Sequence, residues 1–158
     1  MLNKKKAIKE IFKKHDKNSI FITNTGFLSR DVFEIFPENR NIFYMQGSMG
    51  LSPAIGLGLA MNTLMDVVVL VGDASLLMHL GITHTIRDSG LKNLYVYVLD
   101  NGCHESVGAY PCSGLEKSYP GVNEIYKIAK SKKSERVTIS PKENVSFLRE
   151  ILNGKNTS

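Results

Sequence analysis

The sequence of 158 residues contains no tryptophan, only two cysteines and no long run of hydrophobic residues. The two cysteines, Cys103 and Cys112, are too few for a disulfide framework or for a zinc site built from cysteines. No segment approaches the ~20 apolar residues that a membrane-spanning helix needs, and the first residues lack the apolar core of a signal peptide. These absences predict a cytoplasmic protein with reduced thiols and no membrane partner.

The rest of the composition is that of one ordinary globular domain. Hydrophobic residues make up 42% and charged residues 22% of the chain, which is typical of folded domains. Since domains commonly have about 100–200 residues, we expect residues 1–158 to form one domain. The net charge of +5 comes largely from lysines near the amino terminus and from residues 127–136. No aromatic residues alternate with these basic residues as in nucleic-acid grooves, so we expect solvated helix faces and no nucleic-acid partner.

Short apolar segments typical of strands alternate along the chain with segments of helical periodicity. Strands are expected at residues 19–23, 41–45, 66–71, 94–99 and 136–139, and helices at 1–14, 29–36, 52–61, 76–87, 122–130 and 141–152. Ser29 is the expected N-cap of the second helix, and the small residues Gly56, Gly58 and Ala60 suggest that the third helix packs closely against a neighbouring backbone. The alternation predicts an α/β fold in which helices flank one parallel sheet. The longest irregular segment, residues 106–121, is a candidate functional loop.

Polar and small residues follow four of the expected strands, at the end where a parallel sheet binds its ligands. The four turns are Asn24-Thr25-Gly26, Gly47-Ser48-Met49-Gly50, Gly72-Asp73-Ala74-Ser75 and Asp100-Asn101-Gly102. Turn chemistry alone also favours Gly, Asn, Asp and Ser, but it does not explain all four turns equally well. We therefore expect these turns to form a site at one edge of the sheet.

The turn that contains Asp73 combines an acidic side chain with the start of a helix. Free backbone N–H groups at a helix start attract phosphate, whereas the Asp73 carboxylate would repel it. Both features fit if a divalent cation lies between them, with Asp73 binding the metal and the amides of Ala74 and Ser75 holding phosphate oxygens. Mg²⁺ prefers such oxygen ligands together with substrate phosphates. Asn101, at the end of the next strand, could supply a second, neutral oxygen.

These residues resemble the cofactor-binding motifs of thiamine diphosphate enzymes. Gly72-Asp73-Ala74 followed by Asp100-Asn101 is similar to their magnesium–diphosphate motif, and Gly47-Ser48-Met49-Gly50 is similar to the segment that holds the aminopyrimidine ring. More narrowly, the segments FYMQGSMGLSPAIGLGLA, GDASLLMHLG and DNGCHESVG resemble the phosphonopyruvate and sulfopyruvate decarboxylases. The resemblance covers roughly residues 20–108, and more loosely the chain to residue 152. It implies the thiamine diphosphate-binding fold and, within it, a diphosphate-binding domain.

The resemblance implies particular roles for the residues around the metal and the diphosphate. The side chains of Asp73 and Asn101, together with the Cys103 carbonyl, would bind Mg²⁺. Residues that would contact the diphosphate are Ala74 and Ser75, with Thr25 and Gly26 nearby.

The resemblance also implies how the pyrimidine end of the cofactor is held. In the segment that contains Gly47, Ser48 and Met49, the Gly47 carbonyl would accept a hydrogen bond from the 4′-amino group. Met49 would lie under the cofactor and force it to bend, so that the cofactor deprotonates itself and attacks the keto carbon of a pyruvate derivative. The cofactor then acts as an electron sink as carbon dioxide leaves.

Two features depart from the family pattern. The family usually has glycine where Ala74 stands. An alanine there would cost roughly 1 kcal/mol or more if the position needed a positive φ, and nothing if its φ were negative. Relatives also end with a further strand, whereas this chain ends at Ser158, soon after Leu152. The expected domain therefore lacks a final strand.

In such enzymes the cofactor lies between two domains, and this chain has room for the diphosphate-binding one alone. The resemblance implies that a second domain binds the pyrimidine ring and supplies a glutamate to its ring nitrogen. We therefore expect a hetero-oligomer in which a separate alpha subunit brings this domain, and an isolated chain that is inactive and binds cofactor weakly.

Two further side chains follow Asn101 closely and are candidates for proton transfer or substrate contact. His104 is expected at the site, and Glu105 either takes part in catalysis or caps the following turn. The other histidines have simpler explanations: His79 and His84 are expected to serve packing, and His15 is expected at the surface.

The sequence thus predicts the beta subunit of a decarboxylase that uses thiamine diphosphate and Mg²⁺. The HESVG segment resembles the phosphonopyruvate enzymes more closely than the sulfopyruvate enzymes. This resemblance implies 3-phosphonopyruvate as the small anionic 2-oxo acid substrate, with phosphonoacetaldehyde and carbon dioxide as products, as in phosphonate biosynthesis. Sulfopyruvate is the alternative substrate. An alternative of another class is a scaffold subunit that binds little cofactor, with Ala74 as a sign of decay.

Overall fold

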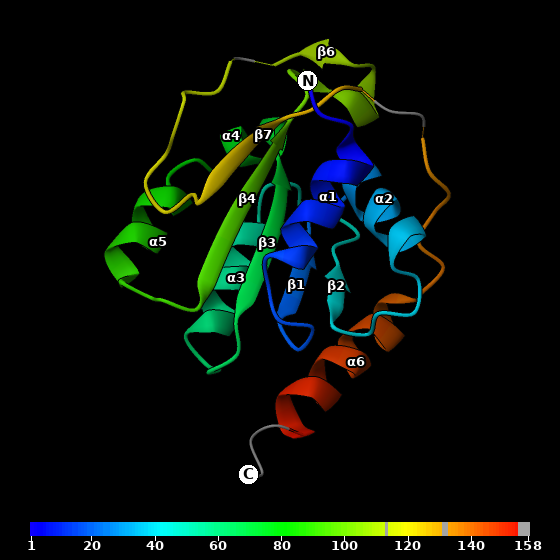
Figure 1. Cartoon of the computed structure of the whole chain (residues 1–158), viewed down its shortest axis with the longest axis vertical. Helices are drawn as coiled ribbons and strands as arrows, with labels where there is room; N and C mark the ends of the chain where they lie inside the picture. Colours follow the sequence, from blue (N-terminus) through cyan, green and yellow to red (C-terminus); the bar gives the residue numbers. More distant parts are fainter. Residues whose placement is uncertain (113, 131–132, 155–158) are drawn as a thin grey trace.

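A sheet of five parallel strands forms the centre of the computed structural model, which describes residues 1–112, 114–130 and 133–154. The strand order is β2-β1-β3-β4-β7, as Figure 1 shows. The strands are β1 (Ile20–Thr23), β2 (Ile42–Tyr44), β3 (Val67–Gly72), β4 (Leu94–Asp100) and β7 (Glu124–Lys127). The expected α/β class and parallel sheet are therefore confirmed.

Strands β3 and β4 are buried because their sequences are rich in β-branched and aromatic residues. Their register aligns Val67 with Leu94 and Gly72 with Leu99. Because β1, β3 and β4 run parallel, their carboxyl ends meet at the same edge of the sheet. Strand β2 runs parallel to them as well, so this edge carries all four turns that the sequence singled out.

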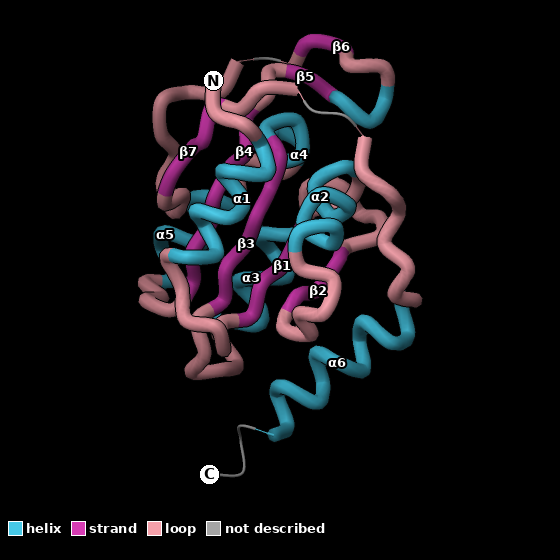
Figure 2. The backbone as a smooth tube through the Cα atoms, turned by 45° about the vertical axis from the view of Figure 1, so that its right-hand side comes forward, coloured by secondary structure: helices cyan, strands magenta, loops and turns pink. Residues whose placement is uncertain are grey.

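Helices cover both faces of the sheet, as Figures 1 and 2 show. The helices are α1 (Lys4–Lys13), α2 (Phe27–Ile35), α3 (Ser52–Ala60), α4 (Asp73–Met78), α5 (Ile82–Ser89) and α6 (Pro141–Gly154). Helices α1 and α2 pack on the face that carries Val68 and Leu70 of β3. Helices α3, α4 and α5 pack on the opposite face, with Val67, Val69 and Val71. None of the helices in the described ranges is long and apolar enough to cross a lipid bilayer.

Helix α2 begins two residues earlier than expected, and Ser29 is not its N-cap. The helix starts after Gly26, whose φ of 85° turns the chain sharply out of β1. Ser29 is buried in the first turn, and its hydroxyl donates to the Asn24 carbonyl at 2.6 Å. The side chain therefore ties the helix back to the strand that precedes it.

The single helix expected at residues 76–87 is two helices, α4 and α5. The chain leaves α4 at His79, which has φ −137° and ψ 45°. Leu76 before the break and Ile82 after it both pack against the core. The apolar residues therefore keep a helical spacing through the break, so the spacing alone predicts one continuous helix.

The helix expected at residues 122–130 is also wrong, because this segment contains β7. Residues 124–127 pair in parallel with β4, and the neighbouring Ile128 forms a bridge with Leu2 from the amino terminus. Strand pairing with two distant segments overrides the helical spacing of the apolar residues. No strand forms at residues 136–139, where Val137 and Ile139 instead pack on the face covered by α1 and α2.

The segment after β4 forms a small hairpin above the carboxyl edge of the main sheet, visible in Figure 2. Strand β5 (Cys103–His104) pairs antiparallel with β6 (Tyr110–Pro111), and the short 3-10 helix η1 (Glu105–Val107) lies between them. The expected irregular segment therefore contains β6 and part of η1.

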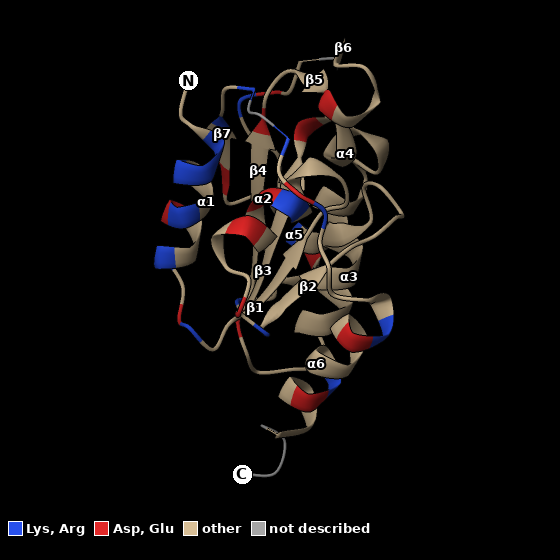
Figure 3. Ribbon diagram, turned by 90° about the vertical axis from the view of Figure 1, so that its right-hand side faces the viewer, with Lys and Arg blue, Asp and Glu red and all other residues tan. Residues whose placement is uncertain are grey.

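The lysines of α1 lie mainly on its outer side, as Figure 3 shows. The expectation of a solvated helix face is wrong for Lys4, which is 4% exposed and points toward the sheet edge. Lys127 of β7 is exposed but pairs with Asp100.

Helix α6, expected at residues 141–152, lies beside the edge strand β2. The amide of Asn144 donates to the Tyr44 carbonyl at 2.8 Å and accepts from the Tyr44 N–H at 3.4 Å. The Asn144 side chain thereby provides the hydrogen bonds that a neighbouring strand would otherwise give to the Tyr44 backbone at the edge of the sheet. Residues 155–158, where the absence of a final strand was expected, lie outside the described part of the chain.

Candidate functional site

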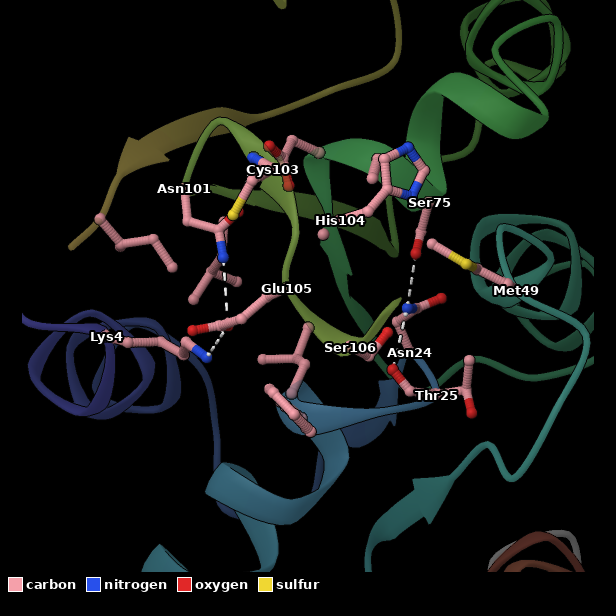
Figure 4. Close-up of a pocket in the computed structure, with 17 residues that line it drawn as sticks. Lys4, Asn24, Thr25, Met49, Ser75, Asn101, Cys103, His104, Glu105 and Ser106 are labelled. Carbon is pink, nitrogen blue, oxygen red and sulfur yellow. Dashed lines mark hydrogen bonds and ion pairs between the residues drawn. The ribbon is translucent and has the colours of Figure 1, made fainter. Parts of the chain in front are cut away.

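A pocket lies at the carboxyl ends of β1, β3 and β4, beneath β5 and η1 (Figure 4). It brings together nine of the residues that the sequence singled out: Thr25, Met49, Asp73, Ala74, Ser75, Asn101, Cys103, His104 and Glu105. Further lining residues include Lys4, Asn24 and Ser106. Segments separated by more than a hundred residues in the sequence therefore meet at the edge where parallel strands end.

Three of the proposed site residues do not line this pocket. Gly26 lies at the start of α2, where an added Cβ would be 3.8 Å from Ser106. Gly47 and Ser48 are exposed in the turn before α3, and Ser48 has a φ of 53°. Met49 is the member of that turn that reaches the pocket.

Asp73 is the first residue of α4 and is 3% exposed. Its Oδ2 atom accepts a hydrogen bond from the Gly102 N–H at 2.9 Å and another from the Cys112 thiol at 3.0 Å. Burial raises the pKa of the Asp73 carboxyl above 3.8, and the adjacent Asp100 raises it further, against the opposing hydrogen bonds from Cys112 and the Ala74 N–H. Burial and the neighbouring Asp100 carboxylate therefore both disfavour the ionised form of Asp73.

Asp100 lies directly beside Asp73, because the Gly102 N–H also donates to its Oδ1 atom at 2.9 Å. Lys127 from β7 pairs with the other oxygen of Asp100. One lysine thus faces two neighbouring carboxylates, which leaves one negative charge at this point. Burial, and then Asp73, raise the pKa of the Cys112 thiol to about 12, so that this thiol stays protonated and donates.

Asn101 and Ser75 place further polar atoms around the same pocket. The Asn101 Oδ1 atom accepts from the Cys103 N–H at 3.1 Å, and its Nδ2 donates to Glu105 at 3.1 Å. The Ser75 hydroxyl accepts from the Asn24 amide at 2.8 Å, so its own proton can be donated to a ligand. Figure 4 shows His104 near Ser75, opposite the Asn101 side.

Comparison with known proteins identifies the family of this chain. Residues 22–156 match the family described as thiamine pyrophosphate enzyme, C-terminal TPP binding domain. The chain belongs to this family. Thiamine pyrophosphate and thiamine diphosphate are two names for the same cofactor, so the resemblance stated from the motifs is confirmed.

Relatives within the family are decarboxylases. The sulfopyruvate decarboxylase subunit beta of Methanocaldococcus jannaschii is 36% identical over 94% of this chain and 75% of its own length. The subunit beta of Methanothermobacter thermautotrophicus is 39% identical over 73% of this chain and 58% of its own length. The phosphonopyruvate decarboxylase of Streptomyces viridochromogenes is 36% identical over 65% of this chain. The chain spans a quarter of that longer relative.

A solved structure supports the same fold. The X-ray structure of a protein from Mycobacterium smegmatis, described as a thiamin diphosphate-dependent enzyme, matches with a TM-score of 0.57 and 21% identity. The match covers 73% of this chain and 24% of that chain. The fold of this chain thus corresponds to one part of that longer polypeptide.

The donor set of the pocket fits Mg²⁺ and a diphosphate. Asp73 and Asn101 offer a carboxylate and an amide oxygen, which are ligands that Mg²⁺ prefers, and the excess negative charge calls for a cation. Within residues 1–112, 114–130 and 133–154 no group of three or more His, Cys, Asp or Glu side chains could hold a metal.

Ala74 fits a TPP-binding domain despite the glycine that the family usually has. It lies inside α4, and Ser48 and Ala109 are the non-glycine residues in the described ranges that have a positive φ. The helical backbone carries alanine without strain. The residue therefore gives no support to a decayed site.

Several residues around the pocket were given no role of their own from the sequence. Asn24, which is 3% exposed, donates to Ser75 and accepts from the Gly50 N–H at 3.4 Å, joining three turns. Its position at the end of β1 indicated a site residue, but asparagine is also typical of ordinary turns. Lys4 reaches the pocket from a distant segment, and the Cys112 thiol contacts Asp73 at its edge. Nothing in the local sequence indicated either contact.

Proposed function

We propose that this chain is the diphosphate-binding subunit of a decarboxylase that uses thiamine diphosphate and Mg²⁺. The observation that carries the proposal is the pocket in which Asp73, Asn101 and Ser75 converge at the carboxyl edge of the sheet. The substrate class is a small 2-oxo acid with a second, strongly acidic group. The HESVG segment favours 3-phosphonopyruvate, which would give phosphonoacetaldehyde and carbon dioxide.

Sulfopyruvate is the second candidate substrate, and a specific observation favours it. The relatives that match nearly the whole chain or most of it are named sulfopyruvate decarboxylase subunit beta. In the relatives named phosphonopyruvate decarboxylase, the matched part is 25% and 21% of the full length. The names of these three relatives therefore favour the sulfonate substrate, whereas the local motif favours the phosphonate.

The residues of this chain would bind and orient the reacting groups. Oxygen atoms of Asp73 and Asn101, with the Cys103 carbonyl, would hold Mg²⁺, and Ser75 would donate its hydroxyl proton to a diphosphate oxygen. When bound, thiamine diphosphate supplies an electron sink for the electron pair released as carbon dioxide leaves. His104, on the opposite side of the pocket from Asn101, would hold or move a proton at the substrate.

A partner subunit would complete the site. The name subunit beta given to three relatives implies an alpha subunit in those proteins. We propose that a similar partner brings the pyrimidine-binding domain and its glutamate to this chain, as a hetero-oligomer. The present pocket would then bind one end of the cofactor, and the partner would bind the other.

The test is a decarboxylation assay on the full chain combined with a pyrimidine-domain subunit, thiamine diphosphate and Mg²⁺. We expect carbon dioxide release from 3-phosphonopyruvate or sulfopyruvate, and the faster of the two identifies the substrate. Asp73→Ala should lower the rate by about 100-fold or more, because changes in residues that only support metal ligands already cost ~10–100-fold. Asp88→Ala is the control, since Asp88 is exposed in α5 and pairs with Arg87.

Two outcomes would contradict the proposal. Full activity of the Asp73→Ala complex would show that the reaction does not need the proposed metal site. Unchanged activity without thiamine diphosphate and Mg²⁺ would show that the reaction does not use this cofactor. Failure of the wild-type chain to bind cofactor within an active complex would instead support the scaffold alternative.

A further inference from the structure

A buried ion network lies at the edge of the pocket, on the side of Asn101 (Figure 4). The Lys4 ammonium of α1 is 2.9 Å from Asp31 Oδ2 of α2 and 2.9 Å from Glu105 Oε2 of η1. The three side chains are 4%, 0% and 14% exposed, respectively. Removing charges from water costs several kcal/mol per ion before pairing compensates. A network this deeply buried therefore needs a reason beyond stability.

The network ends on Asn101, the candidate metal ligand. Glu105 Oε2 accepts from the Asn101 Nδ2 at 3.1 Å as well as from Lys4. At its other end, Asp31 accepts from the Ser134 hydroxyl at 2.5 Å. The order of contacts is thus Ser134, Asp31, Lys4, Glu105 and Asn101, and it joins four segments of the chain that are distant in sequence.

The contacts of Asn101 determine which way its amide points. A carboxylate can only accept, so the amide end that faces Glu105 is the NH₂ group. A backbone N–H can only donate, so the end that faces Cys103 is Oδ1. Both neighbours require the same orientation, which resolves the ambiguity that an amide otherwise has. The oxygen therefore lies on the turn whose Gly102 N–H also contacts Asp73.

Lys4 is fully engaged in this network and is unavailable to bind an anion. Burial alone would lower the pKa of Lys4, but its hydrogen bonds to Asp31 and Glu105 raise the pKa above 10.5 on balance. The ammonium faces two carboxylates, so the group of three carries one net negative charge. Such a group would repel a diphosphate or an anionic substrate rather than bind it.

We infer that Glu105 and Lys4 are positioning residues that hold the Asn101 amide with its oxygen toward the metal site. This inference rests on the proposed function. Glu105 acts by accepting the Nδ2 proton, and Lys4 acts by fixing the Glu105 carboxylate against α1 and α2. The role differs from the catalytic role considered for Glu105 on the sequence alone. Lys4 lies outside the residues matched by the family, which begin at residue 22.

The first test measures the hydrogen bonding of the Asn101 side-chain amide in the absence of metal. In the 15N spectrum of the full chain, the Asn101 side-chain signals are identified by their loss in Asn101→Asp. We expect the bonded Nδ2 proton to exchange with water about tenfold more slowly than the side-chain protons of exposed asparagines. Glu105→Met should remove this protection, whereas Glu105→Gln, which keeps an acceptor oxygen, should retain most of it. Unprotected wild-type protons, or protection that survives Glu105→Met, would overturn the inference.

Lys4→Met tests the next contact, and Lys5→Met is its matched control. Lys5 is the neighbouring residue of α1, and its pair with Glu34 at 2.5 Å is exposed. Protection should fall in Lys4→Met and stay unchanged in Lys5→Met. If Lys4→Met fails to fold, the two Glu105 variants still decide the inference, because Glu105 is not fully buried.

The second test measures metal binding with Mn²⁺, which reports on a Mg²⁺ site by electron paramagnetic resonance. The chain in complex with its partner is titrated with Mn²⁺ in the presence of thiamine diphosphate. Glu105→Met should weaken Mn²⁺ binding by about 10- to 100-fold, and Glu105→Gln should stay near the wild-type value. Equal affinities in wild type and Glu105→Met would overturn the inference and leave the proposed function intact. Absence of Mn²⁺ binding by the wild-type complex would overturn the proposed function itself.

Discussion

At the scale of single residues, His15 shows how a titratable side chain becomes part of a hydrophobic face. It was expected at the surface, but it is half-buried at the end of α1 and contacts the rings of Phe21, Tyr95 and Tyr97. Its Nε2 atom lies 2.9 Å from the Tyr97 hydroxyl. Burial, the largest cause, lowers the pKa of His15 below 6.5.

This lowered pKa predicts a loss of stability in mild acid. The unfolded chain binds a proton at His15 at a higher pH than the folded chain does, so protonation favours unfolding. The free energy of unfolding should therefore fall between about pH 7 and pH 5, where histidine titrates. His15→Gln should flatten this slope in urea denaturation series, whereas His84→Gln, at an exposed position, should not. A slope identical in wild type and His15→Gln would show that other groups cause it.

The candidate site also shows how far single residues can be predicted. Asp73, Ser75 and Asn101 could be named because each follows a buried strand, and parallel strands deliver their carboxyl ends to one edge. Lys4 could not be named, because its lysine-rich surroundings are typical of a solvated helix. Its burial depends on Asp31 and Glu105, which approach it through tertiary packing.

At the scale of elements, α3 packs against the sheet through one of its glycines. A Cβ added at Gly56 would lie 2.4 Å from the Val69 Cγ2 atom of β3, whereas a Cβ at Gly58 would meet nothing within 4 Å. The small residues of this helix were expected to approach a neighbouring backbone. Gly56 instead approaches a side chain of the neighbouring strand, and Gly58 is exposed.

The two glycines form a matched pair for a stability measurement. Gly56→Ala should lower the free energy of unfolding by about 1–3 kcal/mol, because the added methyl group forces the helix away from the strand. Gly58→Ala should raise it by about 0.5–1 kcal/mol, because alanine restricts the unfolded chain and favours the helix. Chemical denaturation of both variants measures the difference. A stabilised Gly56→Ala would mean that α3 and β3 have room between them.

The elements themselves were predictable where local pattern and tertiary structure agree. The strands at Ile20–Thr23, Val67–Gly72 and Leu94–Asp100 are buried apolar runs, and such runs have few alternatives. The strand at Glu124–Lys127 was missed because its apolar spacing is helical and its pairing partners are distant. The break between α4 and α5 was missed because apolar residues on both sides pack on the same face.

At the scale of the whole molecule, the two terminal helices contribute unequally. Helix α1 buries Ala7, Ile8 and Ile11 completely, and the residue before it, Asn3, caps its first turn. Near it, Leu2 exchanges backbone hydrogen bonds with Lys127, the last residue of β7, and with Ala129. Helix α6 is longer, yet Asn144 is its one buried residue in the described part of the chain.

The burial of α1 is large compared with the stability of a typical domain. Burying one isoleucine side chain stabilises the folded state by about 1.5–3 kcal/mol, so Ile8 and Ile11 together contribute about 3–6 kcal/mol. Domains are commonly stable by about 5–15 kcal/mol. Loss of α1 would also leave Asp31 buried without the lysine that compensates its charge.

Removal of residues 1–14 should therefore abolish cooperative unfolding, whereas removal of the chain from residue 141 onward should lower the midpoint and keep a cooperative transition. The family match suggests the opposite, because it includes α6 and begins after α1. The truncation at residue 141 exposes the edge of β2, where Asn144 satisfies the Tyr44 backbone, so its cost should be limited to that edge. Thermal unfolding followed by far-ultraviolet circular dichroism measures both truncations against the full chain. Cooperative unfolding of the chain without α1, at a midpoint near that of the full chain, would show that this helix is an appendage and not part of the core.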